Sequence, residues 1–299
     1  MPLVKALDIY RRAREGGYAV GGFCAENLEM IQAIVAAAEE TCSPLVLTLW
    51  QEDILAVGPG YLESVAMHAA RQSKVPIAIM VDHATTAAFC LTCMLHGHTG
   101  VMIDGSHLPF EENIRLTRQV CEIAHLAGVL VEGELGTVRR TFENSGPYSE
   151  QTVYTDPDQV GEFVRRTGVD SLAVSIGTES GIYSETPHLD FARLRRIVEA
   201  SDVYIVLHGG SGTPHETVRE LVREGVTAMR FASAMRVAFL DTIEQARAAL
   251  GRDYPDTRRI FGPARDAVRQ IVADYMHSLG CAGRAANWWE GRSKWKSAT

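Results

Sequence analysis

Short apolar runs alternate along the chain with longer stretches in which hydrophobic residues recur every three or four positions. The short runs predict strands over residues 18–23, 44–49, 76–81, 100–103, 129–134, 171–175, 203–207 and 226–231. The longer stretches have the periodicity of amphipathic helices and include residues 27–41, 62–72, 111–126, 157–167 and 214–224. Apolar strands that alternate with helices indicate a parallel sheet covered on both faces. Eight such units predict a (β/α)8 TIM barrel of the α/β class.

The predicted barrel is a single domain over residues 1–285, followed by a tail over residues 286–299. Two regions break the regular alternation. A long polar insert over residues 136–155 follows the fifth strand and is typical of a lid. The tail carries Trp288, Trp289 and Trp295 with several basic residues. We interpret it as a packing or subunit-contact segment.

Polar residues and glycines end or directly follow six of the predicted strands. They are Asp82 with His83, Asp104, Glu132 with Glu134, Gly177, the run His208-Gly209-Gly210-Ser211-Gly212, and Arg230. In a (β/α)8 barrel, the carboxyl ends of the strands form the rim on which active sites assemble. The pattern therefore predicts an active site at one end of the barrel.

Two strand-end histidines, His83 and His208, predict a metal site. Imidazoles together with a carboxylate suit a divalent metal that keeps open positions. Asp82 directly precedes His83, so its side chain leaves the backbone in a different direction. Asp82 is therefore a candidate acid or base beside the metal.

The glycine-rich run after the seventh strand, residues 208–212, predicts a phosphate site. Its glycines let backbone N–H groups approach an anion, and Ser211 adds a hydroxyl donor. Ser233, at the start of the helix after the eighth strand, adds another donor at a helix N-terminus.

Composition narrows the class of protein. The chain has 299 residues, with 29 Lys and Arg against 37 Asp and Glu, so its net charge is −8. This acidic balance argues against broad nucleic-acid binding. No apolar run has the length of a membrane span, and the N-terminus lacks the apolar core of a signal peptide. Six cysteines are sparse, and Cys90 and Cys93 lie in a helix-like run, so we predict a cytoplasmic protein with reduced thiols.

Several motifs together resemble the class II (zinc-dependent) fructose- and tagatose-bisphosphate aldolases over roughly residues 1–285. They are Val81-Asp82-His83, Met102-Ile103-Asp104-Gly105-Ser106-His107, Val131-Glu132-Gly133-Glu134-Leu135-Gly136, Ile176-Gly177-Thr178 and Leu207-His208-Gly209-Gly210-Ser211-Gly212. The resemblance implies a barrel that forms homodimers or homotetramers. It also implies Zn²⁺ or another divalent metal, which polarises the carbonyl of dihydroxyacetone phosphate.

The resemblance assigns roles to individual residues. Asp82 matches the acid that protonates the aldehyde oxygen during condensation. His83 and His208 match two of three zinc histidines, and Glu134 matches a carboxylate close to the metal. The implied substrate-binding residues are Asp104, Gly181, Gly209, Gly210, Ser211, Arg230, Phe231, Ala232 and Ser233.

Departures from the family pattern cluster on the rim. Where the family has its third zinc histidine, this chain has Ser180. Where the family has its loop base, this chain has Phe142, and Glu143 next to it is the candidate base. Arg230 replaces an asparagine that contacts the substrate in the family, and Trp50 replaces a small residue. We interpret these changes, with Arg139 and Arg140 on the insert, as retuning toward a substrate with an extra carboxylate or phosphate. Trp50 would fill space or stack on a ring.

The leading hypothesis is a class II aldolase-like lyase that cleaves or forms a C–C bond in a phosphorylated or otherwise anionic ketose, retuned away from fructose bisphosphate. One alternative is a barrel enzyme with a weakened or absent metal site, acting as an isomerase, a dehydratase or a metal-free condensing enzyme. Another alternative is a non-catalytic sugar-phosphate binder.

Overall fold

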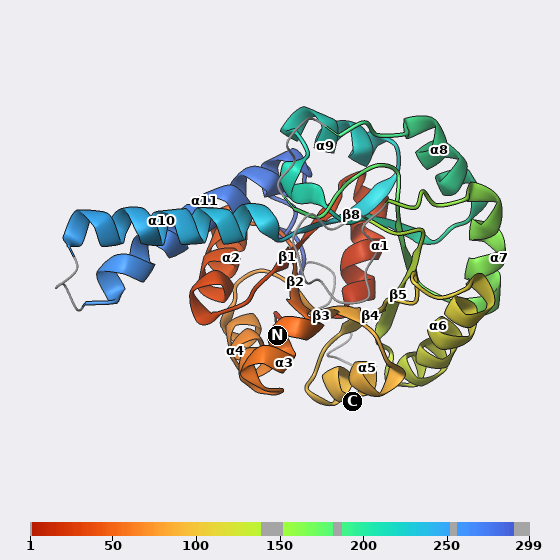
Figure 1. Ribbon diagram of the computed structural model, residues 1–299, viewed down its shortest axis with the longest axis horizontal. Helices are drawn as coiled ribbons and strands as arrows, with labels where there is room; N and C mark the ends of the chain where they lie inside the picture. The colour runs from red at the N-terminus through yellow and green to blue at the C-terminus, as the bar shows by residue number, and fades with distance from the viewer. Residues whose placement is uncertain (1, 139–151, 182–186, 252–255, 290–299) are drawn as a thin grey trace.

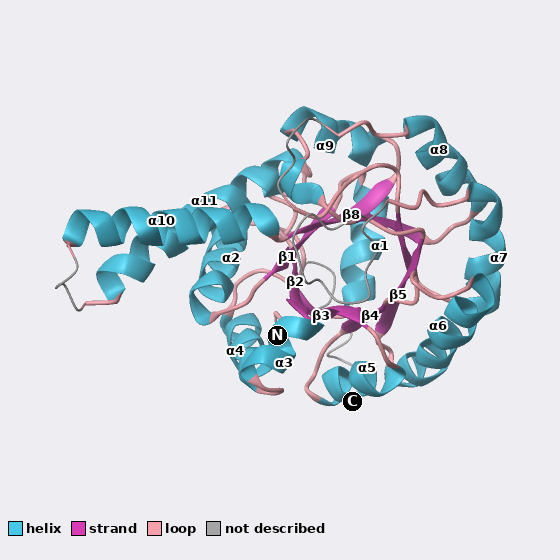
Figure 2. Ribbon diagram, in the orientation of Figure 1, coloured by secondary structure: helices cyan, strands magenta, loops and turns pink. Residues whose placement is uncertain are grey.

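A closed barrel of eight parallel strands forms the centre of the molecule (Figures 1 and 2). The computed structural model describes residues 2–138, 152–181, 187–251 and 256–289. Neighbours around the barrel follow chain order, and the last strand pairs with the first. The strands are β1 Val20–Cys24, β2 Leu45–Trp50, β3 Ile77–Ala84, β4 Gly100–Ile103, β5 Leu130–Leu135, β6 Ser171–Val174, β7 Tyr204–Leu207 and β8 Val226–Phe231. The predicted TIM barrel is confirmed.

Most of the helices surround the barrel and cover the outer face of the strands, whereas α1 is seen through the ring of strands (Figure 2). They are α1 Ala6–Gly16, α2 Leu28–Glu40, α3 Gln51–Val57, α4 Tyr61–Gln72, α5 Ala87–Leu95, α6 Phe110–Ala124, α7 Pro157–Thr167, α8 Phe191–Ala200, α9 His215–Arg223, α10 Ser233–Leu250 and α11 Arg258–Ser278. The side chain of Asn27 accepts a hydrogen bond from Met30 N at the start of α2. Asp156 caps α7 in the same way, with Pro157 in its first turn. These caps explain why both helices begin where the sequence predicts.

Two hydrophobic clusters hold the barrel together. The larger one lies between the strands and the surrounding helices. The smaller one joins strand residues such as Val20, Val46 and Met80 to Ile9 and Tyr10 of α1. Since α1 contacts β1, β2, β3 and β8, this helix packs against the barrel at the chain's beginning. Burial on both faces is what the continuous apolar strands require.

The predicted tail and insert are described only in part. Trp288, in the tail, is fully buried in the smaller cluster, with the Arg12 guanidinium 4.1 Å from its ring centroid. The domain boundary at residue 285 stays a prediction. The ends of the insert pair through an antiparallel bridge between Thr137 and Val153. Most of the insert, including Arg139, Arg140 and Glu143, lies outside the described residues.

The last two helices, α10 and α11, run side by side and extend away from the barrel (Figure 1). Cys90 and Cys93 are buried on α5, as the helical interpretation of their spacing predicts. Among the described residues, none of the helices has the length and apolar character needed to cross a membrane.

Candidate active site

A distortion at the end of β3 places two neighbouring side chains in the same pocket. Consecutive residues of a regular strand point to opposite faces. Here the pairing of β3 with β4 shifts between Val81 and Ala84, and His83 has φ +49°. As a result, Asp82 and His83 both line the pocket at the carboxyl ends of the strands. A histidine in the left-handed region is uncommon, and such strained backbone is concentrated at functional sites.

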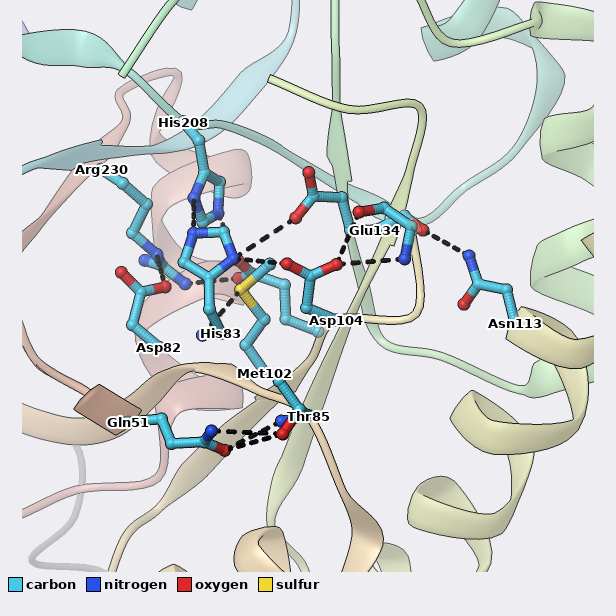
Figure 3. Close-up of polar contacts among 12 residues, drawn as sticks. Gln51, Asp82, His83, Thr85, Met102, Asp104, Asn113, Glu134, His208 and Arg230 are labelled. Carbon is cyan, nitrogen blue, oxygen red and sulfur yellow. Dashed lines mark hydrogen bonds and ion pairs between the residues drawn. The ribbon is translucent and has the colours of Figure 1, made fainter. Parts of the chain in front are cut away.

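His83 and His208 lie in direct contact, although 125 positions separate them along the chain (Figure 3). Nε2 of His83 lies 3.0 Å from Nδ1 of His208. On its outer side, His83 Nδ1 lies 2.8 Å from Asp104 Oδ2. His208 Nε2 lies 3.1 Å from Glu132 Oε1. Each ring is therefore held between a buried carboxylate and the other ring.

The two flanking carboxylates determine which ring nitrogens carry protons. Burial alone would raise the pKa of Asp104, but hydrogen bonds from His83 and Ser106 lower it well below the ordinary value. Ionised Asp104 accepts hydrogen bonds only, so His83 Nδ1 must donate. Glu132 is ion-paired with Arg230, and His208 Nε2 donates to it by the same reasoning. In neutral rings, the inner nitrogens then carry lone pairs that face one another.

Facing lone pairs 3.0 Å apart require a cation between or beside them. A proton would satisfy them by making one ring an imidazolium. A metal ion would also satisfy them, because two nitrogens bound to a tetrahedral zinc at about 2.0–2.1 Å lie about 3.4 Å apart. Metal-binding histidines characteristically donate their other N–H to a carboxylate, as both rings do here. The donor set therefore fits a divalent metal.

Two groups of potential ligands overlap at His83. Asp82, His83 and His208 form one group, and His83, Asp104 and Glu134 form the other. Within each group, the ligand atoms lie within 4.8 Å of one another. Glu134 Oε2 is 3.6 Å from His83 Nδ1, whereas His208 faces Nε2. Glu134 and His208 thus approach different nitrogens of the same ring.

Arg230 reaches across the barrel and is 5% exposed. Its Nη2 forms an ion pair with Glu132, and its Nε lies 3.9 Å from Asp82 Oδ1. Burial disfavours the charged guanidinium, but Glu132, Tyr10 and Asp82 more than compensate and raise the pKa of Arg230. Tyr10 also donates a hydrogen bond to Glu132, at 3.3 Å. The predicted contact of Arg230 with substrate stays a prediction, since its described partner is Glu132.

Gly22 makes room for this side chain. It is the register neighbour of Arg230 across the β1–β8 pair. A Cβ at position 22 would lie 2.7 Å from Arg230 Cδ, closer than carbon atoms approach without displacement. The absence of a side chain on Gly22 thus permits the arginine to pass.

The predicted phosphate loop lies at the same end of the barrel. Gly209 has φ +72°, and a Cβ there would collide with the backbone of Glu179. Ser211 Oγ accepts a hydrogen bond from Ala232 N at 3.1 Å and so joins the loop to the start of α10. The pocket is lined here by Gly181, Gly209, Ser211, Phe231, Ala232 and Ser233. Gly210 is buried, and a Cβ on it would press on the Phe231 ring.

Four residues that line the pocket were not among the predicted site residues: Cys24, Trp50, Ser180 and Arg236. Arg236 is one helical turn beyond Ser233, a spacing that could have revealed it. Its guanidinium lies 5.4 Å from the Trp50 ring centroid. Cys24 completes this part of the pocket. Burial raises the pKa of Cys24 to about 12, so its thiol remains protonated.

A closed (β/α)8 barrel with a histidine–carboxylate cluster and a glycine-rich loop on one rim is typical of barrel enzymes that act on phosphorylated substrates. The sequence profile of the family "Fructose-bisphosphate aldolase class-II" matches residues 4–284. The chain belongs to this family, which typically uses a divalent metal. The predicted family and the prediction of an aldolase-type lyase are both confirmed.

Relatives and solved structures agree with this assignment. A fructose-bisphosphate aldolase of Geobacillus stearothermophilus is 38% identical over 290 residues, covering 96% of this chain and 100% of the relative. The D-tagatose-1,6-bisphosphate aldolase subunit GatY of Klebsiella oxytoca is 36% identical, covering 95% of this chain and 100% of the relative. The YdjI aldolase of Escherichia coli K12 has a TM-score of 0.82 at 29% identity, covering 95% and 99% of the two chains.

Proposed function

We propose that this protein catalyses reversible aldol cleavage of a phosphorylated ketose, with dihydroxyacetone phosphate as the ketone product. The observation that carries the proposal is the pocket in which Asp82, His83 and His208 meet the phosphate-type loop of Gly209 and Ser211. Cleavage of the C–C bond next to a phosphorylated ketone needs a group that stabilises negative charge on the ketone oxygen and a site that binds the phosphate, and this pocket combines the two.

His83 and His208 would hold the divalent metal, for which Zn²⁺ is the proposed ion. Asp82 belongs to the same ligand group, and the predicted ligand Glu134 approaches the group from the other side of His83. The metal would supply a Lewis acid that stabilises negative charge on the ketone oxygen. Asp104 and Glu132 hold the two imidazoles in the required tautomers.

In the condensation direction, the donor's hydroxymethyl carbon loses a proton and forms a bond to the aldehyde carbon. The aldehyde oxygen gains a proton from Asp82, and nothing is oxidised or reduced. The proposed base for the first step is Glu143. The phosphate would bind at Ser211, Ser233 and the backbone N–H groups near Gly209, at the start of α10.

The predicted homodimer or homotetramer and the cytoplasmic location stay predictions. So does the expected extra carboxylate or phosphate on the substrate, because it was inferred in part from Arg139 and Arg140.

The test separates proton removal from C–C cleavage. The zinc-supplemented protein should exchange one carbon-bound proton of dihydroxyacetone phosphate in D₂O, as followed by NMR, without any aldehyde. It should also release a triose phosphate from ketose phosphates. Asp82→Asn should lower cleavage by about 100-fold or more, because general acid–base groups contribute that much, and should preserve more of the exchange.

Two results would contradict the proposal: neither exchange nor cleavage by the zinc-loaded protein, or undiminished cleavage by Asp82→Asn. Full activity in a strong chelator would instead favour the metal-free alternatives.

A further inference from the structure

Part of the pocket is lined by residues outside the phosphate loop. β8, β1 and β2 are neighbours in the barrel, and their carboxyl ends carry the residues concerned (Figure 1). Cys24 ends β1, Trp50 ends β2, and Arg236 lies in the first turns of α10. We call these three residues the distal end of the pocket. If the ketone phosphate occupies the loop of Gly209 and Ser211, the rest of the substrate lies toward this end.

The cation at the distal end already has two acidic partners. Arg236 forms an ion pair with Glu26, and its Nη2 lies 3.5 Å from Asp53 Oδ2. Burial first, and then the nearby Asp82 carboxylate, raise the pKa of Asp53 to about 7 in spite of this contact. Among the described residues, two carboxyl groups, those of Glu26 and Asp53, thus face the Arg236 guanidinium, and the Asp82 carboxylate is close enough to Asp53 to raise its pKa.

The buried guanidinium of Arg230 already lies beside carboxylates of its own. Arg230 is ion-paired with Glu132. A phosphate or carboxylate on the distal part of a substrate would therefore meet a surplus of negative charge in a partly buried site, where charges are weakly screened. Such a group would also have to compete with Glu26 and Asp53 for Arg236.

Trp50 gives the distal end an apolar wall. Its ring lies within cation–π range of Arg236, whose two carboxylate partners fix the guanidinium in place. An indole face packs well against the carbon-bound hydrogens of an uncharged chain or ring. With the protonated Cys24 thiol beside it, this surface favours the binding of an uncharged part of the substrate.

We propose that the distal end selects an uncharged aldehyde, so that the substrates are ketose 1-phosphates and not ketose bisphosphates. Trp50 provides the contact surface, and the Glu26–Arg236–Asp53 cluster disfavours a second phosphate. The proposal rests on the aldol function proposed above and names the substrate class of the same pocket. It replaces the sequence-based expectation of an additional anionic group.

The experiment compares two aldehydes with the same carbon skeleton, D-glyceraldehyde and D-glyceraldehyde 3-phosphate. Each is condensed with dihydroxyacetone phosphate by the zinc-supplemented protein, and kcat/KM is measured. We expect the uncharged aldehyde to be preferred by about tenfold or more, since like charges at this range cost about that much. Proton exchange into dihydroxyacetone phosphate is measured in parallel as the aldehyde-independent reaction.

Measured at about pH 8, where Asp53 with its pKa of about 7 is ionised, Asp53→Asn should shift the preference toward the phosphorylated aldehyde by about tenfold, because it removes a negative charge near the bound group. Asp241→Asn is the matched control, since Asp241 is exposed on α10, the helix that carries Arg236, and does not line the pocket. Trp50→Ser should lower kcat/KM for the uncharged aldehyde more than for the phosphorylated one.

A wild-type preference for D-glyceraldehyde 3-phosphate would overturn the inference, as would equal shifts in Asp53→Asn and Asp241→Asn. If the protein exchanges the proton of dihydroxyacetone phosphate but condenses it with neither aldehyde, the inference is overturned and the proposed function is not. Loss of exchange itself would be a failure of the proposed function.

Discussion

Replacing Arg230 by methionine tests whether this arginine stabilises the barrel or binds the substrate. Arg230 is 5% exposed, and its partner Glu132 is fully buried. Methionine keeps an unbranched side chain beside Gly22 but leaves the Glu132 carboxylate with only its Tyr10, Ser171 and His208 contacts. Removing one partner of a buried ion pair costs about 3–5 kcal/mol, because the other charge stays buried without compensation. We expect Arg230→Met to lower the free energy of unfolding by that amount.

Urea unfolding of four proteins measures the effect: the wild type, Arg230→Met, Glu132→Gln and the double variant, all in chelator so that metal does not contribute. The two residues form one pair. The summed losses in unfolding free energy of the two single variants should therefore exceed the loss of the double variant by about 2 kcal/mol or more. The reasoning is refuted if Arg230→Met costs less than about 1 kcal/mol, or if the two single losses simply add. Normal stability with a raised KM for dihydroxyacetone phosphate would instead assign Arg230 to substrate binding.

Three further predictions concern the same pocket. Asp104→Asn should lower metal affinity by about 10–100-fold, because Asp104 fixes the His83 tautomer; titration against a chromogenic chelator measures it, and unchanged affinity would contradict this role. The pKa of Asp53, raised by burial to about 7 from 3.8, makes the folded state hold that proton more tightly than the unfolded state. Wild-type stability should therefore fall as the pH rises from about 4 to about 7, and Asp53→Asn should lack this component of the slope in unfolding curves. Ser211→Ala should raise KM for dihydroxyacetone phosphate by about tenfold, and a KM equal to wild type would remove Ser211 from the phosphate site.

The barrel was predictable because predominantly apolar strands alternate with amphipathic helices, and because α2 and α7 begin at recognisable caps. The least accurate boundary was the end of β3, predicted at Val81 and found at Ala84. Periodicity fails there because the distortion at His83 departs from the regular pleat. That irregular segment is where the candidate site begins.

Site residues directly after strands were predictable, since topology alone brings strand ends together. The partners of those residues were not. The contact between Arg230 and Glu132 spans 98 positions and depends on the length and direction of a side chain inside the barrel. Arg236 was missed because its ion-pair partners, Glu26 and Asp53, are far from it in the sequence and are brought to it only by the fold.

The close approach of Gly22 and Arg230 constrains the order in which this pair of residues could have changed during evolution. An arginine introduced opposite any larger residue at position 22 would be forced away from Glu132, since even a Cβ meets its Cδ at 2.7 Å. The glycine therefore had to precede the arginine, and reverting position 22 alone should now be harmful. Relatives that carry a larger residue at position 22 should therefore lack the arginine at position 230.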